Sequence, residues 1–168
     1  MRLDPFQQRA LEAVASGYNV LVSAPTGTGK TVIADYVIEQ AVAAGERVIY
    51  TAPIKALSNQ KFTDYRALFG EETIGILTGD VSINPDAPVV IMTTEILRNQ
   101  LMTADERLEN LRWVIFDEIH YIATDRGIAW EESLILLPQG VRVLGLSATI
   151  GNLDALADWM EETLGAPV

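Results

Sequence analysis

Residues 19–31 read N-V-L-V-S-A-P-T-G-T-G-K-T, an apolar run that passes through a glycine-containing loop into a helical pattern. The run 19–24 is short and rich in Val and Leu, which is typical of a strand covered by other elements on both faces. A strand that leads directly into a helix is the first half of a unit whose two strands are parallel. This stretch therefore predicts a parallel sheet flanked by helices.

The rest of the chain repeats the same alternation. Apolar runs predict five further strands at 46–51, 73–77, 89–92, 113–117 and 141–146. Helical patterns occupy 5–15, 30–44, 55–69, 94–102, 130–137 and 153–164, and Gly45 is suited to end the second helix. This order predicts a doubly wound α/β fold, a mostly parallel sheet with helices on both faces. We find no internal repeat or linker, and 82–88 is the only turn-rich segment of any length.

The composition is that of one globular domain. The chain has 168 residues, of which 49% are hydrophobic and 21% are charged, and it contains no cysteine. Disulfides and thiolate metal sites are therefore excluded, and a reducing cytoplasm is the expected location. The start M-R-L-D-P-F-Q-Q-R-A lacks the apolar core of a signal peptide, and no run reaches the ~18 apolar residues that span a bilayer. We expect no membrane association, and the three tryptophans, Trp113, Trp130 and Trp159, are expected in the core.

The net charge of −11 argues against a broad basic face, the usual electrostatic footprint of nucleic-acid binding. From Asp105 onward, twelve acidic residues face four arginines and no lysine. Any phosphate contacts are therefore expected from the first two thirds of the chain.

Functional residues in such a sheet collect at the carboxyl ends of the strands. After the first predicted strand, A24-P-T-G-T-G-K-T31 fits a phosphate-binding loop, with Ala24 in place of the more usual first glycine. Gly27 and Gly29 let backbone N–H groups turn toward phosphate oxygens, Lys30 reaches the β and γ phosphates, and Thr31 can bind Mg²⁺. The loop predicts a nucleoside triphosphate as ligand.

Two acidic residues, Asp117 and Glu118, lie at the end of the strand predicted at 113–117. This strand would bring them to the same edge of the sheet as the loop. One carboxylate can hold the metal and its water shell, and the next can orient and deprotonate an attacking water. A kinase must keep water away from the phosphates, so an adjacent base favours a hydrolase.

Together, P25-T-G-T-G-K-T31, D117-E-I-H120 and S147-A-T149 resemble motifs I, II and III of superfamily 2 helicases, in the family's order. T51-A-P-I-K-A-L57, T78-G-D80 and T93-T-E95 look like nucleic-acid-contacting motifs, and L3-D-P-F-Q7 looks like the segment with the adenine-reading glutamine. The strings P53-I-K-A-L-S-N-Q-K61, T78-G-D-V-S-I-N-P85, M92-T-T-E-I-L-R98 and W130-E-E132 are similar to DExH-box RNA helicases of the exosome-assisting Ski type.

The resemblance implies that residues 1–168 form the first RecA-like motor domain of an ATP-dependent RNA helicase, a P-loop NTPase fold. It implies ATP and Mg²⁺ as cofactors, and single-stranded RNA and a second RecA-like domain as partners. The chain contains no Q-x-x-G-R-x-x-R string of that second domain, so we expect a monomeric, nearly inactive half-motor. The family topology places the strand that ends at Ser147 between those that end at Ala24 and Asp117.

The site residues that follow from the motifs fall into five groups. The catalytic candidates are Lys30, Asp117 and Glu118. The nucleotide-binding candidates are Gln7, Pro25, Thr26, Gly27, Thr28, Gly29, Lys30 and Thr31, and the metal ligands are Thr31 and Asp117. The coupling residues implied are His120, Ser147 and Thr149. The nucleic-acid contacts implied are Thr51, Pro53, Lys55, Gly79, Asp80, Thr93, Thr94 and Glu95.

Two alternatives stay open. A DNA helicase or translocase of the same superfamily is possible, because no residue here can be assigned to reading a ribose 2′-hydroxyl. A nucleotide-binding regulatory module without turnover is the other, and the intact set Lys30, Thr31, Asp117 and Glu118 argues against it.

Overall fold

A computed structural model describes residues 3–25, 29–104, 106–119, 127–149 and 151–168. The elements are α1 (Pro5–Ala15), β1 (Val20–Ser23), α2 (Thr31–Ala43), β2 (Arg47–Ala52), α3 (Lys55–Phe69), β3 (Ile74–Leu77), β4 (Ser82–Ile83), β5 (Val89–Thr93), α4 (Thr94–Met102), η1 (Glu106–Leu108), β6 (Leu111–Phe116), α5 (Gly127–Leu136), β7 (Arg142–Ser147) and α6 (Leu153–Leu164). Every predicted strand and helix is confirmed, with ends that shift by at most three residues.

The strands form one sheet with the order β1-β7-β6-β2-β5-β3-β4. All neighbours are parallel except β3 and β4, which are antiparallel. The strand that ends at Ser147 therefore lies between β1 and β6, as the family topology predicted. The fold class is confirmed as a mostly parallel α/β sheet.

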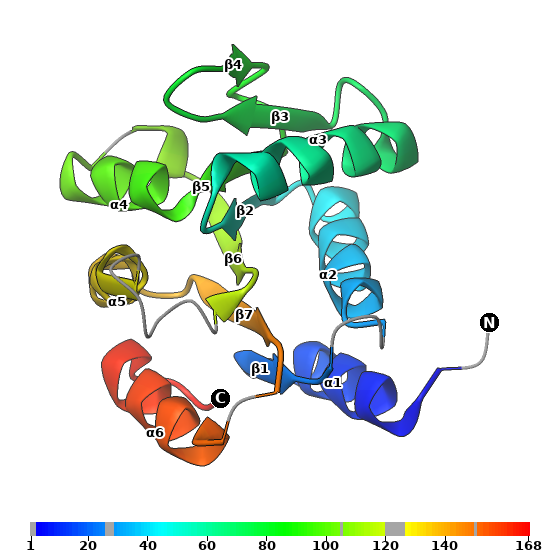
Figure 1. Cartoon of the computed structure of the whole chain (residues 1–168), viewed down its shortest axis with the longest axis vertical. Helices are drawn as coiled ribbons and strands as arrows, with labels where there is room; N and C mark the ends of the chain where they lie inside the picture. The colour runs from blue at the N-terminus through cyan, green and yellow to red at the C-terminus, as the bar shows by residue number, and fades with distance from the viewer. Residues whose placement is uncertain (1–2, 26–28, 105, 120–126, 150) are drawn as a thin grey trace.

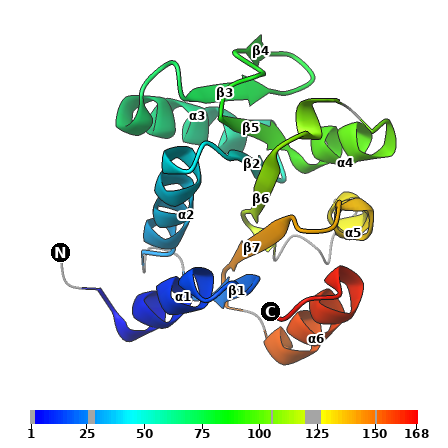
Figure 2. The same ribbon diagram turned by 180° about the vertical axis from the view of Figure 1, so that it is seen from behind.

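Helices cover both faces of the sheet in two layers (Figures 1 and 2). The layer of α1, α2 and α3 shares a buried apolar cluster with one face of the strands, to which Ile33, Val37 and Ile38 contribute from α2. The layer of α4, α5 and α6 shares a second cluster, to which Leu97 and Leu134 contribute. Because strand residues alternate between the two clusters, the central strands are apolar on both sides, which explains their continuous apolar sequence.

The three tryptophans belong to the core as predicted. Trp113 and Trp130 are buried, and the half-buried Trp159 packs against the second cluster with its ring centroid 5.5 Å from that of Trp130. Among the described residues, no helix has the length and apolar character needed to cross a membrane.

The edge of the sheet beyond β3 adds a strand that was not predicted, within the turn-rich segment 82–88. Ser82 and Ile83 form the short strand β4, in which Ile83 pairs with Ile76 of β3. A Cβ atom on Gly75 would lie 2.0 Å from the carbonyl oxygen of Asn84, so this close approach requires glycine. Two exposed residues carry no apolar pattern, which is why the sequence does not reveal this strand.

Candidate functional site

The carboxyl ends of six parallel strands lie along one edge of the sheet, and most predicted site residues lie there. The residues predicted to bind or hydrolyse a nucleotide follow β1 and β6, with Ser147 at the end of β7 between them. The residues predicted to contact nucleic acid follow β2, β5 and β3, farther along the same edge. The topology thus gathers the two predicted groups side by side, with β6 and β2 at their boundary.

Lys30 lies immediately before α2, at the end of the predicted phosphate loop. Its Nζ donates hydrogen bonds to the carbonyl oxygens of Ala24, at 2.6 Å, and of Pro25, at 3.3 Å. Thr31 is the exposed first residue of α2, where the helix dipole favours an anion. The ammonium is therefore held at a helix N-terminus by uncharged acceptors that a phosphate could replace. The predicted residues Thr26, Gly27 and Thr28 lie outside the described residues.

Gln7 connects α1 to the phosphate loop. Its Oε1 accepts the N–H of Asp4 at 2.7 Å, and its Nε2 donates to the carbonyl oxygen of Gly29 at 2.9 Å. Gly29 has φ +91, and a Cβ atom there would lie 2.6 Å from Nε2, so the loop can approach this glutamine only with glycine at position 29. A carboxamide has two donor hydrogens and two acceptor lone pairs, and these two bonds to described residues use one of each.

Asp117 and Glu118 follow β6 directly. The N–H of Asp117 donates to the carbonyl oxygen of Thr51 at 2.9 Å and extends the pairing of β6 with β2. One carboxylate oxygen, Oδ1, accepts the N–H of Glu118 at 2.9 Å, and the other, Oδ2, accepts the hydroxyl of Tyr50. Glu118 has φ +57, a left-handed conformation that costs a non-glycine residue free energy and is concentrated at functional sites. The sharp turn at Glu118 redirects the chain as it leaves the strand.

These groups line one cavity of about 220 Å³. Its lining consists of Gly29, Lys30, Thr31, Leu57, Gln60, Lys61, Asp117, Glu118 and Leu146. The phosphate loop and the Asp-Glu pair, far apart in sequence, thus face the same space. The donor set fits a hydrated Mg²⁺ with a phosphate ligand, because it combines a lysine, a threonine hydroxyl and carboxylate oxygens.

Three residues near this cavity were missed by sequence reasoning: Tyr50, Gln60 and Lys61. Gln60 and Lys61 belong to the Ski-type string that ends at Lys61, and this was the signal available for them. Tyr50 lies within an apolar strand, where its hydroxyl gives no pattern. Burial, and then the negative charge of Asp117, raise the pKa of Tyr50 well above its usual value. The phenol is therefore a neutral hydrogen-bond donor at any physiological pH.

Among the predicted coupling residues, Ser147 ends β7, which lies between β1 and β6. Ser147 is buried, and its hydroxyl donates to the carbonyl oxygen of Ala148 at 2.7 Å. The hydroxyl of Ser23, at the end of β1, donates to the same carbonyl oxygen at 3.1 Å. Thr149 is exposed, and His120 lies outside the described residues. The S-A-T segment is thus fastened to the strand that leads into the phosphate loop.

Two of the predicted nucleic-acid motifs contact each other. Lys55 Nζ lies 2.6 Å from Asp80 Oδ2, and both side chains are exposed. Gly79 lies beneath the lysine, since a Cβ atom there would be 3.6 Å from Nζ. The hydroxyl of Thr78 accepts the N–H groups of Asp80 and Val81 and so fixes the turn. This exposed ion pair is a small stabilising contribution at most, and a phosphate could compete for the lysine.

The predicted nucleic-acid contacts differ in their exposure. Thr51 is 0% exposed, and its hydroxyl donates to the carbonyl oxygen of Ile115 at 3.2 Å, so its side chain cannot reach a ligand in this structure. β2 continues one residue beyond the predicted end, to Ala52. Pro53, Thr93 and Thr94 are buried as well, and Glu95 is half-buried, whereas Lys55, Gly79 and Asp80 are exposed.

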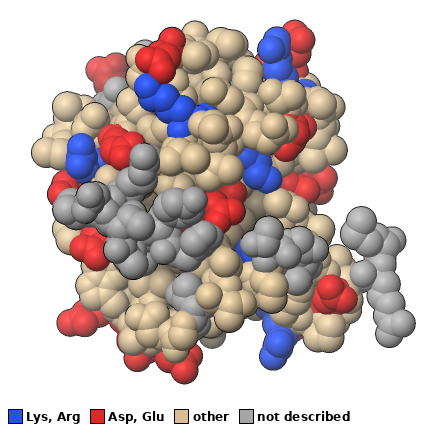
Figure 3. Space-filling view, viewed as in Figure 1, with Lys and Arg blue, Asp and Glu red and all other residues tan. Residues whose placement is uncertain are grey.

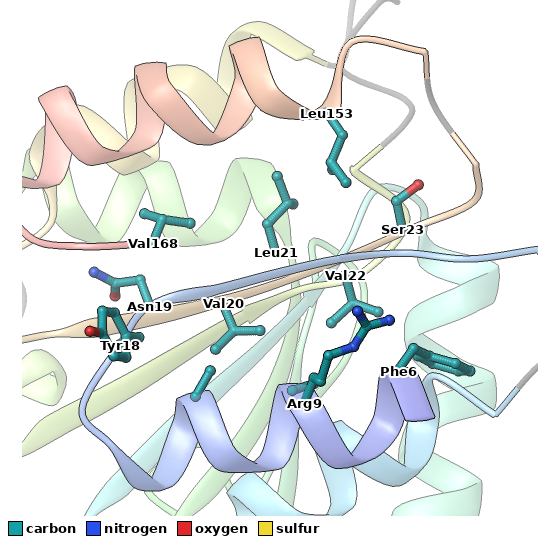
Figure 4. A pocket seen from close by; sticks show the side chains of 12 residues that line it. Phe6, Arg9, Tyr18, Asn19, Val20, Leu21, Val22, Ser23, Leu153 and Val168 are labelled. Carbon is teal, nitrogen blue, oxygen red and sulfur yellow. The ribbon is translucent and has the colours of Figure 1, made fainter. Parts of the chain in front are cut away.

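A larger cavity, of about 530 Å³, lies elsewhere, between α1, β1 and the segment around α6 (Figure 4). Its lining is mainly apolar and includes Phe6, Val20, Leu21, Leu153 and Val168. It lacks Lys30, Asp117 and Glu118, so its size alone does not make it a site for a phosphate.

The surface in the view of Figure 3 carries Lys and Arg singly or in small groups among Asp and Glu, without a broad basic patch. With a net charge of −11, binding to a nucleic-acid backbone would depend on particular hydrogen bonds rather than on a general positive potential.

The geometry agrees with a comparison to known protein families. Residues 4–156 match the family model described as DEAD/DEAH box helicase. The chain belongs to this family. In this helicase domain, the cavity described above brings Lys30 and Thr31 together with Asp117 and Glu118.

Two relatives place this helicase domain near the predicted subfamily. The chain is 50% identical over 159 residues to "ATP-dependent RNA helicase mtr4" of Schizosaccharomyces pombe. The match covers 94% of this chain and 14% of that protein. The chain is 49% identical over 162 residues to "Antiviral helicase SKI2" of Saccharomyces cerevisiae. This match covers 96% of the chain and 13% of that protein. The resemblance to Ski-type DExH helicases is confirmed, and the chain spans less than a fifth of these relatives.

A solved structure supports the same fold. The structure of Mycobacterium smegmatis helicase Lhr bound to ssDNA and AMP-PNP matches with a TM-score of 0.77 and 32% identity. The match covers 93% of this chain and 24% of that one. The helicase domain therefore shares its architecture with a nucleotide-bound helicase.

Proposed function

We propose that this chain is the first motor domain of an ATP-dependent RNA helicase, in which hydrolysis of Mg-ATP drives movement along single-stranded RNA. The observation that carries the proposal is the 220 Å³ cavity in which Lys30 and Thr31 face Asp117 and Glu118. Phosphoryl transfer to water requires a helix N-terminus that binds phosphate and a pair of carboxylates close to it on the same edge of the sheet.

Lys30, Thr31 and Asp117 are assigned to binding. Lys30 would exchange the carbonyl oxygens of Ala24 and Pro25 for phosphate oxygens, and the exposed N-terminus of α2 would receive the remaining negative charge. Thr31 and Asp117 would hold Mg²⁺, which neutralises charge on the phosphates when it is bound. Gln7, which already fixes the carbonyl of Gly29, is assigned to the adenine edge through its remaining donor and acceptor.

Glu118 is assigned to proton transfer. The oxygen of a water molecule attacks the γ phosphorus, Glu118 takes a proton from that water, and the bridging oxygen leaves with ADP. Glu118 is half-buried at the cavity wall, next to Asp117, whose carboxylate would hold the metal. The positive φ of Glu118 turns the chain after β6, so its side chain has a direction that a continued strand would not give it.

The other half of the edge is assigned to the nucleic-acid backbone. Lys55, Gly79 and Asp80 lie together there, and Thr93, Thr94 and Glu95 follow the adjacent strand. RNA is preferred over DNA because the relatives at 50% and 49% identity include one named an RNA helicase. Ser147 and Thr149, with His120, are assigned to coupling the two halves.

The proposal includes a second RecA-like domain that closes over the cavity. An arginine supplied by a partner to the transferred phosphoryl group is worth about 10³–10⁵ in rate. We therefore expect residues 1–168 alone to hydrolyse ATP barely above background. Robust RNA-dependent turnover by this chain by itself would overturn the two-domain mechanism.

The decisive experiment is steady-state ATPase of the chain joined to a second motor domain, with RNA or DNA of the same sequence as stimulator. Stimulation by RNA at least about tenfold beyond that by DNA supports the proposal. A DNA-directed motor is the second candidate, because the Lhr structure contains single-stranded DNA. Equal or stronger stimulation by DNA would favour that candidate.

A further inference from the structure

Tyr50 is a polar side chain in an otherwise apolar part of β2, and it is 0% exposed. It belongs to the cluster between the sheet and the layer of α1, α2 and α3. Packing alone would be satisfied by phenylalanine at this position. A buried hydroxyl is costly unless it is hydrogen-bonded, so its partner indicates what the group does.

The ring of Tyr50 is held by two neighbours from α3. The ring of Tyr65 makes an edge-on contact, with centroids 5.5 Å apart and an angle of 74° between the planes. Lys61 Nζ lies 5.8 Å from the centroid of the Tyr50 ring and 5.3 Å from that of Tyr65. Lys61 also lines the 220 Å³ cavity, so the tyrosine pair contacts a residue of the proposed nucleotide site.

The hydroxyl of Tyr50 donates to Oδ2 of Asp117, the side chain assigned to the metal. With the N–H of Glu118 on Oδ1, each carboxylate oxygen accepts one hydrogen bond from the described part of the chain. An ionised carboxylate has about four lone-pair sites, so about two remain. The two bonds fix the plane of the carboxylate, and the remaining lone pairs are thereby directed before a ligand arrives.

We propose that Tyr50 is a positioning residue, whose hydroxyl orients Asp117 for the metal ion that accompanies the nucleotide. This inference rests on the proposed function and names a group that acts through Asp117 rather than on the substrate. Lys61 and Tyr65 keep the ring in place. Removal of an outer-shell partner of a metal ligand typically weakens metal affinity or activity about 10–100-fold.

The test is the Mg²⁺ dependence of nucleotide binding, measured with a fluorescent ADP and the chain of residues 1–168. Tyr50→Phe removes only the hydroxyl and keeps the ring. We expect it to raise the Mg²⁺ concentration for half-maximal binding by at least about tenfold. Binding measured without metal should stay unchanged. Tyr36→Phe, on α2 and away from the cavity, is the matched control and should leave both quantities unchanged.

A merely structural role for Tyr50 would weaken binding equally with and without Mg²⁺, and that result would overturn the inference. An unchanged Mg²⁺ midpoint in Tyr50→Phe would overturn it as well. Absence of Mg-dependent nucleotide binding in the unaltered chain would instead refute the proposed function.

A second comparison uses Asp117→Asn, which removes the charge that Tyr50 is inferred to orient. Tyr50→Phe added to Asp117→Asn should shift the Mg²⁺ midpoint no further than Asp117→Asn does alone. A full additional tenfold shift in the double variant would show that Tyr50 acts independently of Asp117, contrary to the inference.

Discussion

Gln7→Glu is the sharpest test of the contact between α1 and the phosphate loop. Gln7 is only 5% exposed, accepts the N–H of Asp4 and donates to the carbonyl oxygen of Gly29. Glutamate has nearly the same shape, but its ionised carboxylate cannot donate. The variant would therefore place a buried negative charge against a carbonyl oxygen, unless the carboxyl holds a proton and donates in place of the amide.

The proton sets the size of the effect. A protonated glutamic acid reproduces both hydrogen bonds, so the destabilisation cannot exceed the cost of keeping that proton. With an unfolded pKa of about 4.3 and ~1.36 kcal/mol per pH unit, this limit is ~3.7 kcal/mol at pH 7 and ~1 kcal/mol at pH 5. The lost hydrogen bond sets a lower bound of about 1 kcal/mol at pH 7. Burial of the introduced carboxyl group raises its pKa in the folded variant above its value in the unfolded chain. The variant therefore has its full stability below the unfolded pKa and loses stability as the pH rises through the folded pKa.

The assay is urea unfolding followed by circular dichroism between pH 5 and pH 8, always as a difference from the unaltered chain. Gln8→Glu is the matched control, since Gln8 is exposed and its Nε2 donates to the carbonyl oxygen of Leu3 at 3.2 Å. The control should stay within about 0.5 kcal/mol of the unaltered chain. If Gln7→Glu lost no more stability than Gln8→Glu at pH 7, or lost the same amount at pH 5 and pH 8, the reasoning would be refuted.

Three further predictions follow from other contacts. In the two-domain protein, Glu118→Gln should retain nucleotide binding and lower ATP turnover by about 10²-fold or more. Lys30→Ala should instead weaken nucleotide binding itself. If Glu118→Gln kept more than about a tenth of the unaltered turnover, Glu118 would not be the general base. Asn19→Ala should lower the free energy of unfolding by about 1–3 kcal/mol, because the buried N–H of Val143 loses its acceptor at 2.7 Å; a loss below about 0.5 kcal/mol in a denaturant titration would contradict this. Ser147→Ala should reduce RNA unwinding more than ATP binding, since the Ser147 hydroxyl contacts a backbone carbonyl; equal losses in the two assays would count against a coupling role.

The sequence predicted the layers of the fold because the central strands are buried on both faces and therefore apolar throughout. Val89–Thr93 and Leu111–Phe116 are examples, since nearly every residue in them is buried. The phosphate loop was equally visible, because its chemistry lies in consecutive residues. β4 was not visible, since it depends on the close approach of Asn84 to Gly75 rather than on an apolar pattern.

The parts of the site that were missed depend on contacts between distant segments. The bond from Tyr50 to Asp117 requires the register in which Tyr50 pairs with Ile115 and Thr51 with Phe116. No local pattern specifies that register. Thr51 was assigned to a nucleic-acid contact from its motif, and the motif alone does not show that its side chain is buried.

The proposed function requires that Mg-nucleotide binds at the carboxyl edge of the sheet, between the phosphate loop and the Asp-Glu pair. A titration of the ¹⁵N-labelled chain with Mg-ADP, followed by amide chemical shifts, tests this binding site. We expect the largest changes at Gly29, Lys30 and Thr31 and at Asp117 and Glu118. Changes confined to the larger apolar cavity of Figure 4, with those five amides unmoved, would contradict this expectation.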